Sequence, residues 1–211
     1  MMKRWIASLN ACWAASIIFA GAYWLSNKLT SLRADVGTGV FSWERVIPFV
    51  PWTLVPYLAI LVFFLLSFFV DPDRRELQRH VSRVILVLLI SLVCYALFPL
   101  RFTFERPPVE GAFGPLYGLL ESFDLPYNRA PSLHISVLVL LWARFIPCLT
   151  LVQGVCLRAW FLLIAGSVLT TFQHHVIDIP GGIMVGTVAI FLTSPPIAEA
   201  LSRVLPRRLA A

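Results

Sequence analysis

The chain has 211 residues, of which 59% are hydrophobic and 13% are charged, and its formal net charge is +6. Soluble domains carry about 25% charged residues, so this composition excludes an ordinary soluble protein and predicts a polytopic integral membrane protein. A basic chain can bind nucleic acid. Here, however, the Lys and Arg residues lie between apolar runs, where orientation signals occur, and we expect no nucleic-acid partner.

Six apolar runs follow one another along the chain, and they predict an all-α bundle of six transmembrane helices. The expected spans cover residues 5–25, 52–70, 84–100, 132–147, 158–174 and 179–197. Ala20-Gly21-Ala22 resembles a signal-peptide cleavage site, but the apolar run continues through Leu25, so we expect an uncleaved anchor. We find no repeat or long linker and expect a single integral membrane domain over residues 1–211.

Orientation follows from the distribution of positive charge. With a cytoplasmic N-terminus, the inner segments hold eleven of the 17 Lys and Arg residues, including Arg203, Arg207 and Arg208, and the outer segments hold six. The excess predicts cytoplasmic termini, and we expect a bacterial inner membrane with the functional face on the periplasmic side. His80, in the charged connector 71–83, is expected to be solvated, and Cys12, Cys94, Cys148 and Cys156 are expected to be buried thiols.

The segment 173–182 holds two imidazoles and a carboxylate in a very apolar chain. A charge deep in a bilayer costs about 2.5–3.5 kcal/mol or more, so ionisable groups beside spanning segments are functional candidates. If residues 160–178 are helical, His174 and Asp178 are four residues apart and share a face. The carboxylate can then hold the imidazole in one tautomer.

Two further segments, 131–134 and 101–107, fall on the same external side in this topology. Phosphoryl transfer needs positioning and positive charge, which the planar fork of arginine supplies. A nucleophilic imidazole needs an orienting acceptor, and the leaving alkoxide needs a proton donor. Arg106, His174 with Asp178, and His134 fill these roles, and Ser132 can add a hydroxyl at the start of the fourth span.

These motifs resemble the type 2 phosphatidic acid phosphatase superfamily: Arg106-Pro107, Pro-Ser-x-His at 131–134 and His174-x-x-x-Asp178 occur in its order. The pattern Ser167…Thr171-x-Gln173-His174 looks more like the inositol phosphorylceramide synthase-like branch. The chain also resembles the membrane half of bacterial fusions with a dual-specificity phosphatase. The resemblance covers spans three to six closely. It implies a phosphohistidine at His174, oriented by Asp178, with His134 protonating the leaving group and Arg106 and Ser132 binding phosphate. Members typically use no metal or other cofactor.

The chain departs from the family pattern at three positions. Pro99 stands where the family has a lysine, which Arg101 can replace as a phosphate ligand. Leu133 replaces the glycine of Pro-Ser-Gly-His, and Ser167-Val168 lacks the usual arginine. These departures leave open whether the enzyme hydrolyses its substrate or transfers the phosphoryl group.

We therefore expect a lipid phosphate phosphatase that meets its substrate among membrane lipids at the outer face. Three alternatives stay open: a lipid phosphotransferase, a non-catalytic scaffold or transporter of the same fold, and a zinc or iron site built from histidines and an aspartate. His175 competes with His174 as the nucleophile because it also shares a helix face with Asp178. Arg129 is expected to be a loop charge, with phosphate contact as an alternative, and Gly181 and Gly182 are expected to permit close helix packing.

Overall fold

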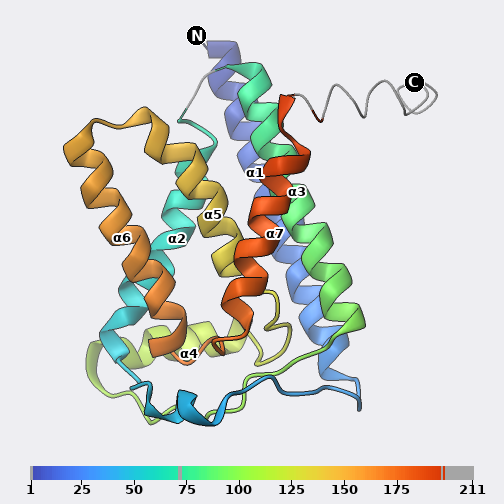
Figure 1. Ribbon diagram of the computed structural model, residues 1–211, viewed down its shortest axis with the longest axis vertical. Helices are drawn as coiled ribbons and strands as arrows, with labels where there is room; N and C mark the ends of the chain where they lie inside the picture. Colours follow the sequence, from blue (N-terminus) through green and yellow to red (C-terminus); the bar gives the residue numbers. More distant parts are fainter. Residues whose placement is uncertain (1, 71–72, 196, 198–211) are drawn as a thin grey trace.

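The computed structural model describes residues 2–70, 73–195 and 197, and the regular structure of these residues is entirely helical (Figure 1). The predicted all-α class is confirmed. The helices are α1 (Met2–Ser31), α2 (Leu54–Ser67), α3 (Arg74–Leu97), α4 (Gly114–Phe123), α5 (Leu133–Phe145), α6 (Leu151–Thr170) and α7 (Asp178–Leu192). Short 3₁₀ turns cover Ser42–Val46, Pro51–Thr53, Gly111–Phe113 and Ile146–Cys148.

Six of the helices run along one common direction, and α4 lies across one end of them (Figure 1). Helix α5 is central, since it packs against α2, α3, α6 and α7. Most of its side chains are buried, as expected for a helix that is apolar on every side. The first residues of α5 and α7 and the last residues of α6 meet at the end covered by α4 (Figure 1).

Three helices, α1, α3 and α6, are long and apolar enough to cross a membrane. The other apolar helices of the bundle, with their adjoining turns, cover Pro51–Ser67, Leu133–Cys148 and Asp178–Leu192 and are only 10–17 residues long. A helix needs about 20 residues to cross the hydrocarbon core. The six predicted spans are therefore not supported by helix length, although the large apolar side chains exposed on α1 and α6 agree with a membrane protein.

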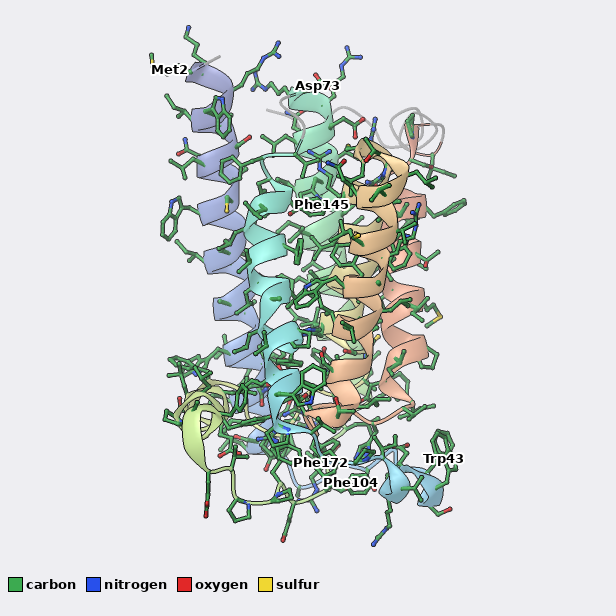
Figure 2. The ribbon with its side chains drawn as sticks, turned by 90° about the vertical axis from the view of Figure 1, so that its left-hand side faces the viewer. Met2, Trp43, Asp73, Phe104, Phe145 and Phe172 are labelled. Carbon is green, nitrogen blue, oxygen red and sulfur yellow. The ribbon has the colours of Figure 1, made fainter. Side chains whose placement is uncertain are left out.

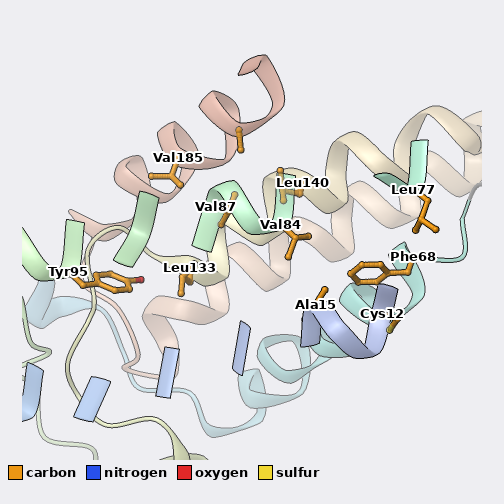
Figure 3. Close-up of a cluster of buried hydrophobic side chains, with 11 residues drawn as sticks. Cys12, Ala15, Phe68, Leu77, Val84, Val87, Tyr95, Leu133, Leu140 and Val185 are labelled. Atoms are coloured by element: carbon orange, nitrogen blue, oxygen red, sulfur yellow. The ribbon is translucent and has the colours of Figure 1, made fainter. Parts of the chain in front are cut away.

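Two clusters of buried hydrophobic side chains hold the bundle together, and α5 contributes to both. The first joins α1, α3, α5 and α7 through residues such as Ala15, Val87 and Leu140 (Figure 3). The second joins α2, α5 and α6 through residues such as Leu54 and Phe161.

Helices α5 and α7 approach each other closely. A Cβ atom at Gly182 would lie 2.6 Å from the backbone oxygen of Ser132, and one at Gly186 would lie 2.8 Å from that of Ser136. The predicted role of Gly182 in close helix packing is therefore confirmed, and Gly186 has the same role one turn further along α7. This contact fixes the start of α7 against the start of α5.

Several local predictions are wrong. The connector 71–83 is largely helical, because Asp73 caps α3 by accepting a hydrogen bond from the backbone N–H of Glu76 (3.4 Å). His80 consequently lies on α3 and is buried, with its Nε2 atom 2.7 Å from Ser67 Oγ. Helix α4 lies between the expected spans 84–100 and 132–147, where no helix was predicted.

The thiols also differ from expectation. Cys12 is buried and Cys94 is partly buried, but Cys148 and Cys156 are exposed, because they lie on the outer side of the bundle. The arginines at 203, 207 and 208, which entered the orientation argument, lie outside the described residues.

Candidate active site at the covered end of the bundle

His174 follows a helix end and is not part of the helix expected over residues 160–178. Helix α6 ends at Thr170 because Phe172, which is labelled at the lower end of the bundle in Figure 2, adopts a left-handed conformation (φ 55°). The N–H groups of Gln173 and His174 then turn back to the carbonyl oxygen of Val168 at 3.1 and 3.0 Å, which is a common way to close a helix C-terminus. The turn carries His174 towards the start of α7.

The predicted pair is nevertheless formed. Nδ1 of His174 lies 3.1 Å from Oδ2 of Asp178, the first residue of α7, and the same oxygen accepts the backbone N–H of His175 at 2.9 Å. Both side chains are buried. A turn and a helix start, rather than one continuous helix, hold the carboxylate against the imidazole.

His134 lies in the first turn of α5. Ser132 caps this helix, since its Oγ atom accepts the N–H of Ile135 (3.3 Å) and its own N–H donates to the backbone oxygen of Asp178 (3.1 Å). The His134 ring stacks on Tyr57, with centroids 4.2 Å apart. Its Nε2 atom is buried and has no hydrogen-bond partner among the described residues.

The two imidazoles line one cavity of about 470 Å³. Most of its wall is apolar and comes from α1, α2 and α5, with residues such as Phe19, Leu61 and Val137. Asp124 is among the few polar residues of this lining. We refer to this space as the apolar cavity.

A second cavity, of about 540 Å³, is lined by polar residues that include Arg106, Asp124 and Arg129. Asp124 lines both spaces, so this polar cavity adjoins the apolar cavity at that residue. Arg101, by contrast, is exposed and belongs to neither lining in the part of the chain that the structure describes.

Arg106 supports the turn that presents His174. Its Nε and one terminal nitrogen donate to the backbone oxygens of Thr171 (3.1 Å) and Phe172 (3.2 Å), and its other terminal nitrogen lies 2.6 Å from Glu121. The structure thus brings Ser132, His134, His174 and Asp178 together and places Arg106 beside them. It leaves Arg101 outside, because the backbone of Arg101 pairs with Gly37 at the rim.

His175, the alternative nucleophile, is engaged on both ring nitrogens. Nδ1 lies 2.7 Å from Oε2 of Glu44, and Nε2 lies 3.1 Å from Oγ1 of Thr103. The ring also stacks on Phe102, with centroids 4.4 Å apart. A ring held in this way is less available for nucleophilic attack than that of His174, which faces the apolar cavity.

Glu44 is a residue that the sequence analysis missed. It is almost completely buried, and its Oε2 atom also accepts the N–H of Val176 at 3.2 Å. Glu44 therefore fixes the turn after His174, as Arg106 fixes the turn before it. A single acid between Trp43 and Arg45 offered little signal, because the partners of Glu44 lie about 130 residues away in the chain.

Arg129 is buried rather than a loop charge at the surface. Its NH1 atom lies 3.3 Å from Asp124 Oδ2 and 3.0 Å from Gln173 Oε1, and NH2 lies 2.6 Å from the oxygen of Leu125. Burial by itself disfavours the charged guanidinium, but Asp124 and nearby acidic groups raise the pKa of Arg129 above its ordinary value. In the sequence, the only indication that Arg129 lies near the site was its position just before the Pro-Ser-x-His motif.

Within residues 2–70, 73–195 and 197, no group of three or more His, Cys, Asp or Glu side chains is arranged to hold a metal ion. The zinc or iron alternative therefore has no ligand set in that part of the chain. Comparison with protein-family models, with curated proteins and with solved structures found no match.

Proposed function

We propose that this protein is a membrane-embedded lipid phosphate phosphatase of the type 2 phosphatidic acid phosphatase kind. One observation carries the proposal: the imidazoles of His134 and His174 line a single, largely apolar cavity, and a buried carboxylate lies against Nδ1 of His174. Two histidines, one of them oriented by an acid, suit a double displacement at phosphorus.

In the first step, Nε2 of His174 attacks the phosphorus atom, an N–P bond forms and the P–O bond to the lipid breaks. Asp178 accepts the hydrogen bond from Nδ1–H and stabilises the positive charge that develops on the ring. His134, in its protonated form, donates a proton to the leaving lipid oxygen. In the second step neutral His134 accepts a proton from water, and the water oxygen attacks phosphorus. A P–O bond forms, the N–P bond to His174 breaks, and inorganic phosphate is released.

Arg106 supplies positive charge beside this site. Three of its five N–H donors bind Thr171, Phe172 and Glu121, which leaves two for phosphate oxygens. The apolar cavity, lined by residues such as Phe19 and Leu61, suits acyl or isoprenoid chains better than a water-soluble phosphate ester.

The membrane arrangement is part of the proposal. We place all six bundle helices within the bilayer, because the short helices α2 and α7 also expose large apolar side chains such as Val62, Leu66, Met184 and Phe191. Helix α5 is enclosed by its neighbours and needs no lipid contact along its whole length. The balance of Lys and Arg places the termini in the cytoplasm and the candidate site at the outer face.

Phosphoryl transfer to an alcohol is the second candidate, and the apolar wall around His134 and His174 favours it. A second lipid that carries a hydroxyl group could occupy this space more readily than water. The phosphohistidine intermediate would then transfer its phosphoryl group to that hydroxyl, and His134 would accept the hydroxyl proton. The same histidines serve both reactions, so the acceptor distinguishes them.

The test uses the purified full chain in detergent with ³²P-labelled long-chain phosphatidic acid, with and without dioctanoylglycerol as the acceptor, so that a transferred product differs from the substrate in chain length. We expect free phosphate and a base-stable, acid-labile phosphoenzyme, both absent from His174→Ala. His175→Asn should still form the phosphoenzyme, because both ring nitrogens of His175 are already engaged by Glu44 and Thr103. Labelled lipid product in place of free phosphate would support the transferase, and a phosphoenzyme that persists in His174→Ala would contradict the assigned nucleophile.

A further inference from the structure

We propose that Arg129 and Gln173 form a phosphate-binding pair at the junction of the two cavities. This inference rests on the proposed function and adds two ligands for the phosphate group of the lipid. From the sequence, phosphate contact was only an alternative for Arg129, and Gln173 had no assigned role.

Both side chains are completely buried and carry donors without a partner. The Nε–H of Arg129 and the amide nitrogen of Gln173 are buried and have no hydrogen-bond acceptor among the described residues. The two side chains touch each other, since Arg129 NH1 lies 3.0 Å from Gln173 Oε1. Buried donors are nearly always paired in folded proteins, and a phosphate oxygen is the acceptor that a guanidinium binds most strongly.

The backbone before each residue is held in an uncommon conformation. Asn128 and Phe172 have φ values of 56° and 55°, and they are the non-glycine residues with positive φ in the described part of the chain. At Phe172 this conformation also closes α6, and backbone of this kind clusters at active sites and ligand clamps. Thr30 of α1 holds Asn128 through a 2.7 Å hydrogen bond, so Arg129 projects from an anchored turn rather than from a free loop.

The position of the pair suits a phosphate group that must reach the nucleophile. Arg129 lines the polar cavity together with Arg106. Gln173 directly precedes His174, which lines the apolar cavity. A phosphate at this junction would keep its negative oxygens on the arginine side and offer its phosphorus atom to the imidazole.

Asp124 is the competitor for this phosphate. It lines both cavities and lies 3.3 Å from NH1 of Arg129, while Tyr23 of α1 donates to its other oxygen at 2.6 Å. The carboxylate therefore occupies the place of an anion beside Arg129. Binding of phosphate would replace this ion pair with hydrogen bonds from the same guanidinium to phosphate oxygens.

Two substitutions separate a ligand from a merely structural ion pair, because the ligand role predicts a loss of anion affinity in one variant and a gain in the other. If Arg129 binds phosphate, Arg129→Gln weakens anion binding and Asp124→Asn strengthens it by removing the competitor. If Arg129 serves only to neutralise Asp124, neither substitution raises anion affinity. Arg45→Gln is the matched control, since Arg45 is an exposed arginine at the same end of the bundle.

The experiment measures binding of orthovanadate, a phosphate analogue, to the purified full chain in detergent by calorimetry. We expect Arg129→Gln to weaken binding about 10- to 100-fold, as for loss of a charge-assisted hydrogen bond. We expect Asp124→Asn to strengthen it about 3- to 10-fold by the same reasoning. Arg45→Gln should bind as the wild type does.

Unchanged affinity in folded Arg129→Gln, weaker binding in Asp124→Asn, or no binding by the wild type would overturn the inference. If Arg129→Gln does not fold, Gln173→Leu, which removes the other unpartnered donor without a change of charge, is measured in its place, and unchanged affinity there would overturn the inference. A wild type that binds orthovanadate through Arg129 but hydrolyses no lipid phosphate would contradict the proposed function and leave the binding pair standing.

Discussion

Gly186 of α7 faces α5 where there is no room for a side chain, and this makes its replacement by alanine a sensitive test of the packing. A Cβ atom there would lie 2.8 Å from the backbone oxygen of Ser136 and 2.8 Å from Cβ of Val139. Neither atom belongs to the flexible end of a side chain, so the two helices would have to separate. Overpacking of this kind costs about 1–3 kcal/mol of unfolding free energy.

Gly166 of α6 provides the matched control, because a Cβ atom added there meets no described atom within 4 Å. Replacing a helical glycine by alanine gains about 1 kcal/mol in intrinsic helix propensity, and this gain is common to both variants. The difference between Gly186→Ala and Gly166→Ala is therefore the packing term, and we expect Gly186→Ala to be about 1–3 kcal/mol the less stable.

The assay is reversible unfolding of each purified variant in mixed detergent micelles, followed by circular dichroism. Equal unfolding free energies for the two variants would show that α5 and α7 are not in close backbone contact. The close contact between the first turns of these helices, which positions Asp178 near Ser132, would then be contradicted as well.

Three further predictions concern single side chains. Asp178→Asn should keep both hydrogen bonds to the turn but lower kcat about 10²- to 10⁴-fold, because it removes the charge that stabilises the imidazolium; an unchanged kcat with phosphatidic acid would contradict the orienting role. Glu44→Ala should lower the free energy of unfolding by about 1–3 kcal/mol, since it leaves buried donors of His175 and Val176 unpaired, and unfolding titration would detect this loss; equal stability would argue against the buried network. Phe161→Ala should lower the free energy of unfolding by about 3–5 kcal/mol through the cavity it leaves. Leu162→Ala, on the exposed side of α6, should change the free energy of unfolding little in the same titration. Similar losses in both variants would contradict the burial of Phe161.

The apolar runs by themselves determined the helices of the bundle, although not α4, which lies across its end. A long run of apolar residues with charged flanks can satisfy its backbone groups in a lipid environment only as a helix, so the all-helical class and the approximate positions of six helices followed from the sequence. The identity of His134, His174 and Asp178 as candidates also followed from it, because ionisable residues are rare in such runs.

Only the tertiary structure decided how these residues meet. The end of α6 depends on a left-handed residue at Phe172 and on hydrogen bonds to Val168, which apolar composition does not specify, and so the helix predicted through His174 was wrong although its contact with Asp178 was right. The burial of Glu44 likewise depends on His175 and Val176. That of His80 depends on Ser67 of α2, and that of Arg129 depends on Gln173 as well as on its neighbour Asp124. A charge is stable inside a protein only where such partners converge, and convergence is a property of the packed chain.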